Sequence, residues 1–294
     1  MAKRLSAEQC PGVYRRNIGD IRVATVNDGK YPTAFDHIIG VDAARCRQAH
    51  EAAHAPTPPW LTIDTFLVDT GDRLMLVDSG FAGAGPTTGR LVSNLALLGV
   101  KPADIDAILM THLHADHVGG LTDENGQRAF ANAELVVHED EIAFWEDEGT
   151  LSRLVELQKP DFGRAQKALN AYRGRTRAVR TNEEVASGVS ATPTPGHTPG
   201  HSAWRISSGD ETLLIWGDMV HLPSIQFAIP EASVIYDVDP DAAAQSRRHV
   251  LDMAAADQIL VAGIHLSFPG YGWVRKTPSG GFAYVAETWT PVLE

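Results

Sequence analysis

The residues best suited to do chemistry are gathered in one short segment, THLHADH, which holds three histidines and one aspartate. Side chains two positions apart in extended backbone point the same way, so His112 and His114 can bind one metal ion together. If a helix begins at Asp116, then Asp116 and His117 diverge by about 100° and can reach a second ion. The spacing therefore predicts a place for two neighbouring metal ions.

Three later motifs offer further ligands. The motif PGHTPGH supplies His197 and His201, and the residues alone do not choose between them. Asp218 in WGD and His265 in GIHLSF would, taken singly, be a turn aspartate and a core histidine. They become candidates because the first segment needs ligands to complete its coordination. The other histidines are expected to be non-ligands, although His221 stands out because it follows Asp218 by three residues.

Each of these motifs follows an apolar segment of strand type, the first one a buried strand over about residues 106–110. In layered α/β proteins, reactive groups gather at strand ends, where loops converge. We therefore expect four strand ends to meet at one rim of a mixed α/β fold. Helices are expected over residues 240–256 and over 151–172, the latter interrupted at Pro160 and Gly163.

The segment THLHADHVGG resembles the HxHxDH signature of the metallo-β-lactamase superfamily. The other matches to that family occur in its order: LVDSG at 76–80, PGHTPGH at 195–201, WGD at 216–218 and GIHLSFPG at 263–270. The resemblance covers roughly residues 60 to 270 and implies a four-layered αβ/βα sandwich. We expect a single domain over residues 1–294, with residues 1–40 as a candidate N-terminal extension.

The resemblance also implies which residues bind the metals. His201 is left behind the ligands, as a supporting or packing residue. Asp78 in LVDSG is expected to fix the ligand loop through an outer contact, with an ordinary turn aspartate as the equal alternative. The implied ligands are His112, His114 and His197 for the first ion, Asp116, His117 and His265 for the second, and Asp218 as the bridge between them.

Five imidazoles and two carboxylates suit Zn²⁺ and tolerate Mn²⁺, Co²⁺ or Fe. Two such ions lower the pKa of bound water from about 15.7 toward roughly 7, so hydroxide forms at neutral pH. A carbonyl or phosphoryl oxygen of the substrate is then polarised at an open metal position. Asp116 is the candidate that accepts or relays the proton. We therefore predict a dinuclear metal-dependent hydrolase that needs no serine or cysteine nucleophile.

Three stretches, FANAELVVHEDEIAFW, GDMVHLPSIQFAIPEASVIYDVDPDAAAQSR and HLSFPGYG, resemble the methyl-parathion-hydrolase-like branch of the family. That branch implies lactone or ester hydrolysis in an apolar pocket, with phosphotriester turnover as a side activity. Trp145 matches one of its wall residues, and His221 is a candidate for substrate contact. Phe81 and Phe268 are further wall candidates, although a place in the core is the favoured alternative for each. Ala84 stands where organophosphate-active members have an aromatic residue, which argues against efficient phosphotriester turnover.

The composition limits the partners and the location. A formal net charge of −12 speaks against nucleic acid as a partner. Cys10 and Cys46 are expected to be free thiols in a reducing compartment. The chain shows no secretory signal and no apolar run near the roughly 18 residues of a membrane span. We therefore expect a cytoplasmic enzyme that does not bind membranes, and the family resemblance implies a homodimer.

Two alternatives stay open. A glyoxalase-II-like thioester hydrolase shares the THxHxDH and GHTPGH motifs, although this chain has no basic C-terminal cluster to hold a glutathione carboxylate. A non-catalytic metal-binding protein on the same fold is the second, because fold alone does not establish activity. Metal analysis and a substrate panel distinguish these alternatives from a lactone or ester hydrolase.

Overall fold

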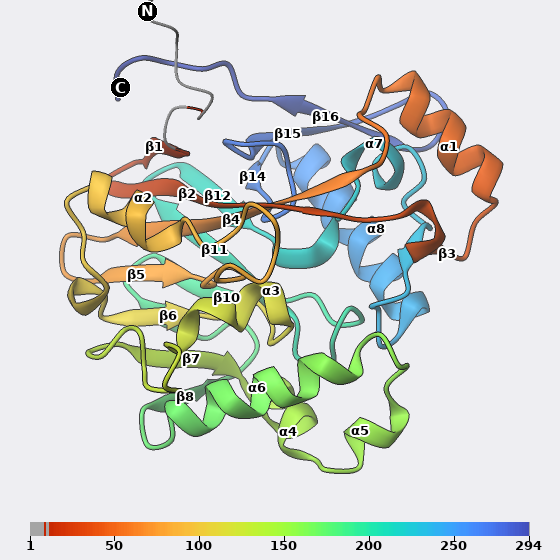
Figure 1. Ribbon diagram of the computed structural model, residues 1–294. Helices are drawn as coiled ribbons and strands as arrows, with labels where there is room; N and C mark the ends of the chain where they lie inside the picture. The colour runs from red at the N-terminus through yellow and green to blue at the C-terminus, as the bar shows by residue number, and fades with distance from the viewer. Residues whose placement is uncertain (1–8, 10–11, 294) are drawn as a thin grey trace, which may run out of the picture.

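The computed structural model describes residue 9 and residues 12–293. Two seven-stranded sheets face each other, and helices cover their outer faces, which gives four layers (Figure 1). The strand order is β1-β2-β4-β5-β6-β7-β8 in the first sheet and β16-β15-β14-β12-β11-β10-β9 in the second. This arrangement confirms the four-layered αβ/βα sandwich predicted from the sequence.

The first sheet combines an antiparallel half with a parallel half. Pairs from β1 to β5 are antiparallel, and pairs from β5 to β8 are parallel. Its strands are β1 (Val13–Ile18), β2 (Ile21–Pro32), β4 (Trp60–Asp69), β5 (Leu74–Val77), β6 (Ala107–Leu109), β7 (Glu134–His138) and β8 (Thr176–Val179). Within the candidate extension over residues 1–40, β1 and β2 are therefore part of this sheet. Burial of Ile21 and Val23 between the two sheets holds them there.

The second sheet is antiparallel except for the parallel pair β12 and β14. Its strands are β9 (Glu184–Ala186), β10 (Val189–Pro193), β11 (Ser202–Ser208), β12 (Glu211–Ile215), β14 (Leu260–Ala262), β15 (Tyr271–Lys276) and β16 (Phe282–Ala286). Two short strands, β3 (Ile38–Ile39) and β13 (Ser233–Val234), pair separately. The central core lies between the two large sheets, where side chains such as Phe66, Met75 and Trp204 are buried.

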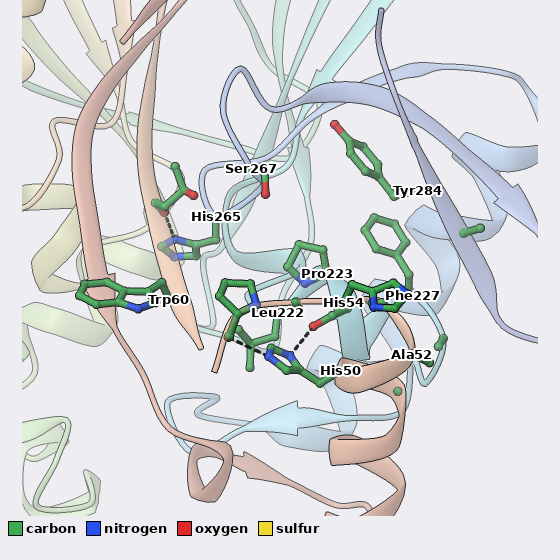
Figure 2. A pocket seen from close by; sticks show the side chains of 18 of the residues that line it. His50, Ala52, His54, Trp60, Leu222, Pro223, Phe227, His265, Ser267 and Tyr284 are labelled. Atoms are coloured by element: carbon green, nitrogen blue, oxygen red, sulfur yellow. Dashed lines mark hydrogen bonds between the residues drawn. The ribbon is translucent and has the colours of Figure 1, made fainter. Parts of the chain in front are cut away.

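Helices bury apolar side chains against the outer face of each sheet. The first sheet is covered by α2 (Leu91–Leu97), α4 (Glu139–Glu146) and α6 (Lys159–Ala171), and the second by α8 (Pro240–Ala256). The remaining helices are α1 (Ala43–Ala52), α3 (Ala115–Val118), α5 (Thr150–Arg153) and α7 (Pro223–Gln226), with 3-10 turns η1 (Phe35–His37), η2 (Pro102–Asp104), η3 (Gly119–Leu121) and η4 (Gly217–Met219). Residues from α1 and α7 line a crevice of about 890 Å³ (Figure 2).

The predicted helix over residues 240–256 is confirmed at both ends, and the side chain of Asp239 caps it by accepting the N–H of Ala242. The predicted interruptions at Pro160 and Gly163 are wrong, because α6 runs through both residues. Pro160 lies in the first turn, where its missing N–H removes no helical hydrogen bond.

Cys46 is a buried free thiol, whereas Cys10 lies outside the described residues. Over the described part of the chain, no helix combines the length and the apolar character needed to cross a membrane.

Candidate metal centre

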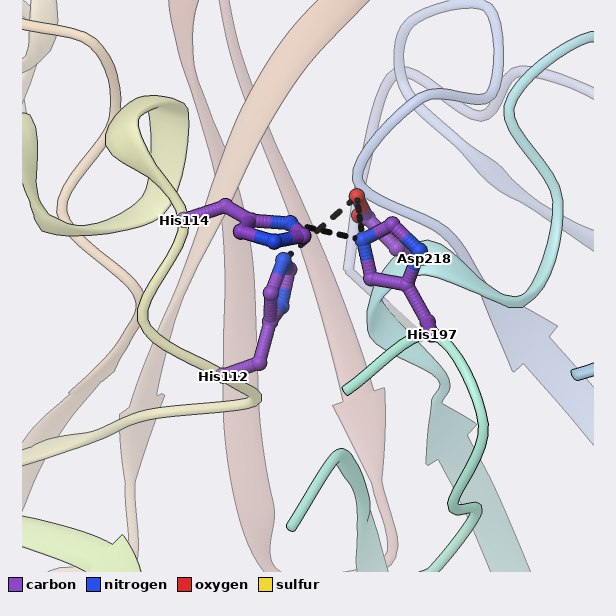
Figure 3. A group of neighbouring side chains, drawn as sticks. All are labelled: His112, His114, His197 and Asp218. Atoms are coloured by element: carbon purple, nitrogen blue, oxygen red, sulfur yellow. Dashed lines mark hydrogen bonds and ion pairs between the residues drawn. The ribbon is translucent and has the colours of Figure 1, made fainter. Parts of the chain in front are cut away.

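Side chains that follow β6, β10 and β12 meet at one rim of the fold and form a first cluster of ligand atoms. His112, His114, His197 and Asp218 are buried, and each offers one ligand atom within 4.8 Å of the others (Figure 3). His114 Nδ1 lies 2.9 Å from His197 Nε2, and the same His197 nitrogen lies 3.3 Å from Asp218 Oδ2. These positions agree with the ligands expected for the first ion.

A second cluster lies directly beside the first. Asp116, His117 and His265 also bring their ligand atoms within 4.8 Å of one another. Asp218 joins the two clusters, because its Oδ1 lies 3.1 Å from Nε2 of both His117 and His265. The structure thus brings together all seven residues that the sequence proposes as ligands. Asp218 stands in the position expected of a bridge.

The polar atoms that meet here lack partners within the described protein. Four buried atoms make no hydrogen bond among the described residues: Nε2 of His112, His117 and His265, and Oδ1 of Asp218. A buried polar group without a partner destabilises a fold by about 1–3 kcal/mol. Imidazole nitrogens and carboxylate oxygens are the donors that Zn²⁺ and similar ions prefer. The residues present therefore fit a pair of divalent metal ions.

The protein environment favours the metal-binding protonation state at some ligands and opposes it at others. Burial lowers the pKa of His117, His197 and His265, but the neighbouring carboxylates outweigh it and raise these pKa values, that of His197 to about 9. A cation would therefore bind there by displacing protons. Burial alone would raise the pKa of Asp218, but the surrounding histidines outweigh it and hold that pKa well below the ordinary value. Burial lowers the pKa of His112 and His114 well below the ordinary value, and neighbouring imidazoles lower it further. An ionised carboxylate beside neutral imidazoles is the form that coordinates a cation.

Two residues expected behind the ligands lie in that position. Asp78 Oδ2 lies 2.7 Å from His117 Nδ1, and the same carboxylate accepts hydrogen bonds from the N–H and hydroxyl of Thr111. His201 Nε2 accepts the N–H of Asp218 at 3.0 Å. Burial, together with the neighbouring His197, lowers the pKa of His201 to about 3, so its ring is neutral. Asp78 supports the first ligand loop and His201 supports the bridge.

A buried carboxylate that the sequence did not single out ties two ligand loops together. Glu141 Oε1 accepts the Leu113 N–H at 2.9 Å and the Trp145 indole N–H at 2.6 Å. Its Oε2 accepts the Thr198 hydroxyl at 2.6 Å and the Gly200 N–H at 3.1 Å. Leu113 lies between two ligands in sequence, and Thr198 follows His197. Glu141 therefore fixes the two loops relative to each other.

A second missed carboxylate lies behind His197. Asp237 Oδ1 accepts a hydrogen bond from His197 Nδ1 at 2.7 Å, and its Oδ2 accepts the Val234 N–H at 2.9 Å. The buried Arg247 guanidinium lies 3.8 Å from Asp237 and donates to two backbone carbonyls. A carboxylate that binds the far nitrogen of a ligand histidine fixes its tautomer and its orientation. No local pattern in the sequence marked Asp237, because the ligand that it supports, His197, lies 40 residues earlier in the chain.

A pocket of about 280 Å³ opens onto the clusters. Phe81 and Ala84 line it, whereas Phe268 does not. Trp145 is not a wall residue, which corrects the expectation from the sequence: it is fully buried, and its ring packs 5.6 Å from that of His114. His221 lines the pocket, and its Nε2 lies 3.1 Å from Asp218 Oδ2. With Asp218 and His265 it forms a third group whose ligand atoms lie within 4.8 Å of one another, so the structure places it among the possible ligands, although the sequence predicted a non-ligand.

Known proteins are similar to this chain in sequence, and solved structures are similar to it in fold. An N-acyl homoserine lactonase from Bacillus sp. is 27% identical over 194 residues, which cover 57% of this chain and 69% of the relative. The probable metallo-hydrolase YqjP of Bacillus subtilis (strain 168) is 28% identical over 239 residues, which cover 75% of this chain and 70% of the relative.

Two solved structures align with nearly the whole chain. The first, hydrolase AbOPH in the beta lactamase superfamily, matches with a TM-score of 0.90 and 28% identity, over 96% of this chain and 100% of that one. The second, AidC, is described as a dizinc quorum-quenching lactonase in complex with a product, N-hexanoyl-L-homoserine. It matches with a TM-score of 0.89 and 25% identity, over 95% and 98% of the two chains.

The model of the Metallo-beta-lactamase superfamily matches residues 58–262, more than half of the chain. That range contains six of the seven clustered side chains and Asp78, and His265 follows it by three residues. With its sandwich fold, its two ligand clusters and these relatives, the chain belongs to the metallo-beta-lactamase superfamily and is a metallo-hydrolase.

Proposed function

We propose that this enzyme is a dinuclear lactonase, with zinc as the metal and lactones, together with simple esters, as substrates. The observation that carries the proposal is the bridging position of Asp218 between two ligand clusters at the base of a small pocket. When bound, two divalent ions supply a nucleophile derived from water at neutral pH and a Lewis acid for the substrate carbonyl.

Asp116 is the residue we assign to proton transfer. Its side chain is 22% exposed, whereas those of His117, Asp218 and His265 are 3% exposed or less. Asp116 Oδ1 and Oδ2 each lie 3.6 Å from a histidine Nε2 of the second cluster, and the residue lines the pocket. A carboxylate held at the edge of the cluster can accept a proton from the attacking water and pass it to the leaving oxygen.

His221 is the residue we assign to substrate contact beside the clusters. It lines the pocket, and its Nδ1 is buried without a hydrogen-bond partner among the described residues. Its Nε2 lies close to the bridging Asp218. In a neutral imidazole whose Nε2–H donates to the Asp218 carboxylate, Nδ1 is an acceptor, so it can receive a hydrogen bond from an N–H or O–H group of the substrate or product.

Lactones are favoured over other substrates by the relatives and by the pocket. An N-acyl homoserine lactonase and the lactonase AidC are both similar to this chain. The pocket of about 280 Å³ suits a compact ring, and Ala84 occupies the wall position where an aromatic residue was expected in organophosphate-active members. Phosphotriester turnover is therefore proposed as a weak side activity.

A metal analysis followed by a substrate panel tests the proposal. The purified protein is expected to contain about two zinc ions per chain. The panel comprises N-acyl homoserine lactones, unsubstituted lactones, an aryl ester, S-lactoylglutathione and a paraoxon-like triester. We expect kcat/KM to be highest for lactones. A metal-free protein, or one that prefers S-lactoylglutathione, would overturn the proposal, and light scattering on the same sample tests the expected homodimer.

A further inference from the structure

The helix α8 lies against two of the loops that carry ligands of the first cluster. On one side, the Ser246 hydroxyl donates to the Pro195 carbonyl at 2.6 Å, two residues before the ligand His197. A Cβ atom at Gly196 would lie 2.1 Å from a backbone nitrogen of α8, so only glycine allows this loop to approach the helix so closely. On the other side, the helix reaches the loop of the bridging aspartate through Arg247.

Arg247 is 1% exposed, and its guanidinium holds the bridge loop by its backbone. Its Nε donates to the Met219 carbonyl at 2.6 Å, and its Nη1 donates to the Pro230 carbonyl at 2.9 Å. Met219 directly follows the bridging Asp218 in sequence. Because the Asp218 N–H donates to His201, hydrogen bonds fix the backbone on both sides of the bridging side chain.

The remaining nitrogen of the guanidinium faces the carboxylate that supports His197. Nη2 of Arg247 lies 3.8 Å from Asp237 Oδ2, within ion-pair distance, and Asp237 Oδ1 accepts from His197 Nδ1. Among the ion pairs of the described residues, Asp237 has these two basic partners. A buried carboxylate is costly without a cationic partner. His197 belongs to the first cluster, so Arg247 is the counter-charge of Asp237 that lies outside both clusters.

We propose that Arg247 is a positioning residue of the metal centre, which holds the bridge and His197 in one arrangement. Its planar guanidinium presents donors in a fixed fork, so it can bind two carbonyls and face a carboxylate at once, which the single ammonium group of lysine cannot do. The donor atoms of Asp218 and His197 must keep a fixed separation to share one zinc ion. The inference rests on the metal centre of the proposed function, and it concerns how tightly that centre holds zinc rather than which lactone it cleaves.

Two substitutions of Arg247 test this assignment. Arg247→Lys keeps the charge but not the fork, so we expect zinc affinity, measured by competition with a chelator, to fall about 10-fold. Arg247→Gln also removes the charge beside Asp237, and we expect a loss nearer to about 100-fold. The control is Arg248→Lys, the same exchange at the adjacent, exposed residue of α8, which should leave zinc affinity unchanged.

A comparison of the apo and zinc-loaded proteins separates positioning from a role in stability alone. Zinc raises the melting temperature of the wild type because it binds the folded state. For a tenfold loss of affinity, this zinc-induced rise should shrink by roughly 3 to 5 °C in Arg247→Lys. Equal lowering of both melting temperatures, with zinc affinity at the wild-type value, would show that Arg247 only supports the fold, and the inference would be overturned. Failure of both Arg247 variants to fold would overturn it for the same reason.

A double variant, Arg247→Lys with Asp237→Asn, tests whether Arg247 acts through Asp237. Residues that work through a shared contact have effects that do not combine independently. We expect the double variant to lose less zinc affinity than the product of the two single losses. A loss equal to that product or larger would overturn the inference. If the wild type binds zinc but hydrolyses no lactone, the proposed function fails, while the affinity comparison still decides the role of Arg247.

Discussion

Two cavities of this enzyme share His265 as a wall residue, yet they differ in what their polar atoms do. In the crevice of about 890 Å³, His50 Nδ1 lies 2.8 Å from the Ser224 hydroxyl, and Nε2 lies 3.0 Å from the Pro56 carbonyl oxygen (Figure 2). Both nitrogens are satisfied within the protein. In the pocket of about 280 Å³, His265 donates from Nδ1 to the Thr62 carbonyl, but its Nε2, although 3.1 Å from Asp218 Oδ1, makes no hydrogen bond among the described residues.

The difference teaches that the volume of a cavity does not identify the site here. The larger crevice is lined mainly by alanines and aromatic side chains, together with a histidine that joins α1 to α7, and it contains one buried hydroxyl, that of Tyr284, without a hydrogen-bond partner among the described residues. The smaller pocket is where buried, unpartnered nitrogen and carboxylate atoms meet. Because such atoms destabilise a fold unless something binds them, they mark the place that a cation would occupy.

The largest effect is expected from Asp218→Ala, which removes the oxygen atoms shared by the two clusters. We expect kcat/KM for the best lactone to fall by at least about a thousandfold, because several kcal/mol of transition-state stabilisation depend on the bound ions. Metal content, measured by mass spectrometry, should fall below about two ions per chain. If the Asp218→Ala variant kept both ions and a tenth of the wild-type activity, Asp218 would not be essential to the metal centre. The unpartnered atoms of the smaller pocket would then not mark the metal site.

Chelation of the metals tests the same idea without a substitution. The apo protein should lose activity and recover it on addition of zinc. If metal is normally present at about a thousand times its Kd, its removal lowers the free energy of unfolding by about 4 kcal/mol. For a chain of this size we expect the melting temperature to fall by roughly 10 °C. An unchanged melting temperature in calorimetry would mean that the unpartnered atoms do not hold ions.

A smaller effect is expected from Asp237→Asn, which sharpens the comparison by weakening the support of one ligand. The neutral amide is a poorer acceptor for the His197 Nδ1–H, and its NH₂ cannot accept the Val234 N–H that Oδ2 now binds. Loss of such a contact lowers metal affinity by about 10- to 100-fold. Titration with a competing chelator measures this affinity, and an unchanged affinity would remove Asp237 from the supporting residues.

Much of this centre could be predicted because its chemistry is local in sequence. His112, His114, Asp116 and His117 lie within six residues, and a strand directly precedes them. Asp78 and His201 could be placed because they belong to motifs that resemble those of the family. The α8 helix was predictable from its apolar spacing, and the structure adds the cap that Asp239 provides.

What could not be predicted depends on contacts between distant segments. Glu141 and Asp237 are ordinary acidic residues in the sequence, and their importance comes from partners on other loops. Trp145 was expected in the pocket wall, but an aromatic residue on a helix beside a site can face either the cavity or the core. Its indole N–H reaches Glu141, which holds it in the core. The pairing of β2 with β4 likewise depends on long-range strand contacts.

The smallest effect on activity is expected in the larger crevice, at His50→Ala. This change removes two partly buried hydrogen bonds and the edge-to-face contact with Phe35, whose ring centroid lies 4.9 Å away. Chemical denaturation should show a free energy of unfolding lower by about 1–3 kcal/mol, because the partners at Ser224 and Pro56 are left without their hydrogen bonds. Metal content and kcat/KM should stay within about twofold of wild type, since additivity holds for sites without shared partners.

A loss of activity above tenfold in a folded, fully metal-loaded His50→Ala variant would contradict the assignment of the larger crevice as a structural cavity. The crevice would then act on catalysis through their shared wall residue, and hydrogen-bond satisfaction would no longer separate the two cavities.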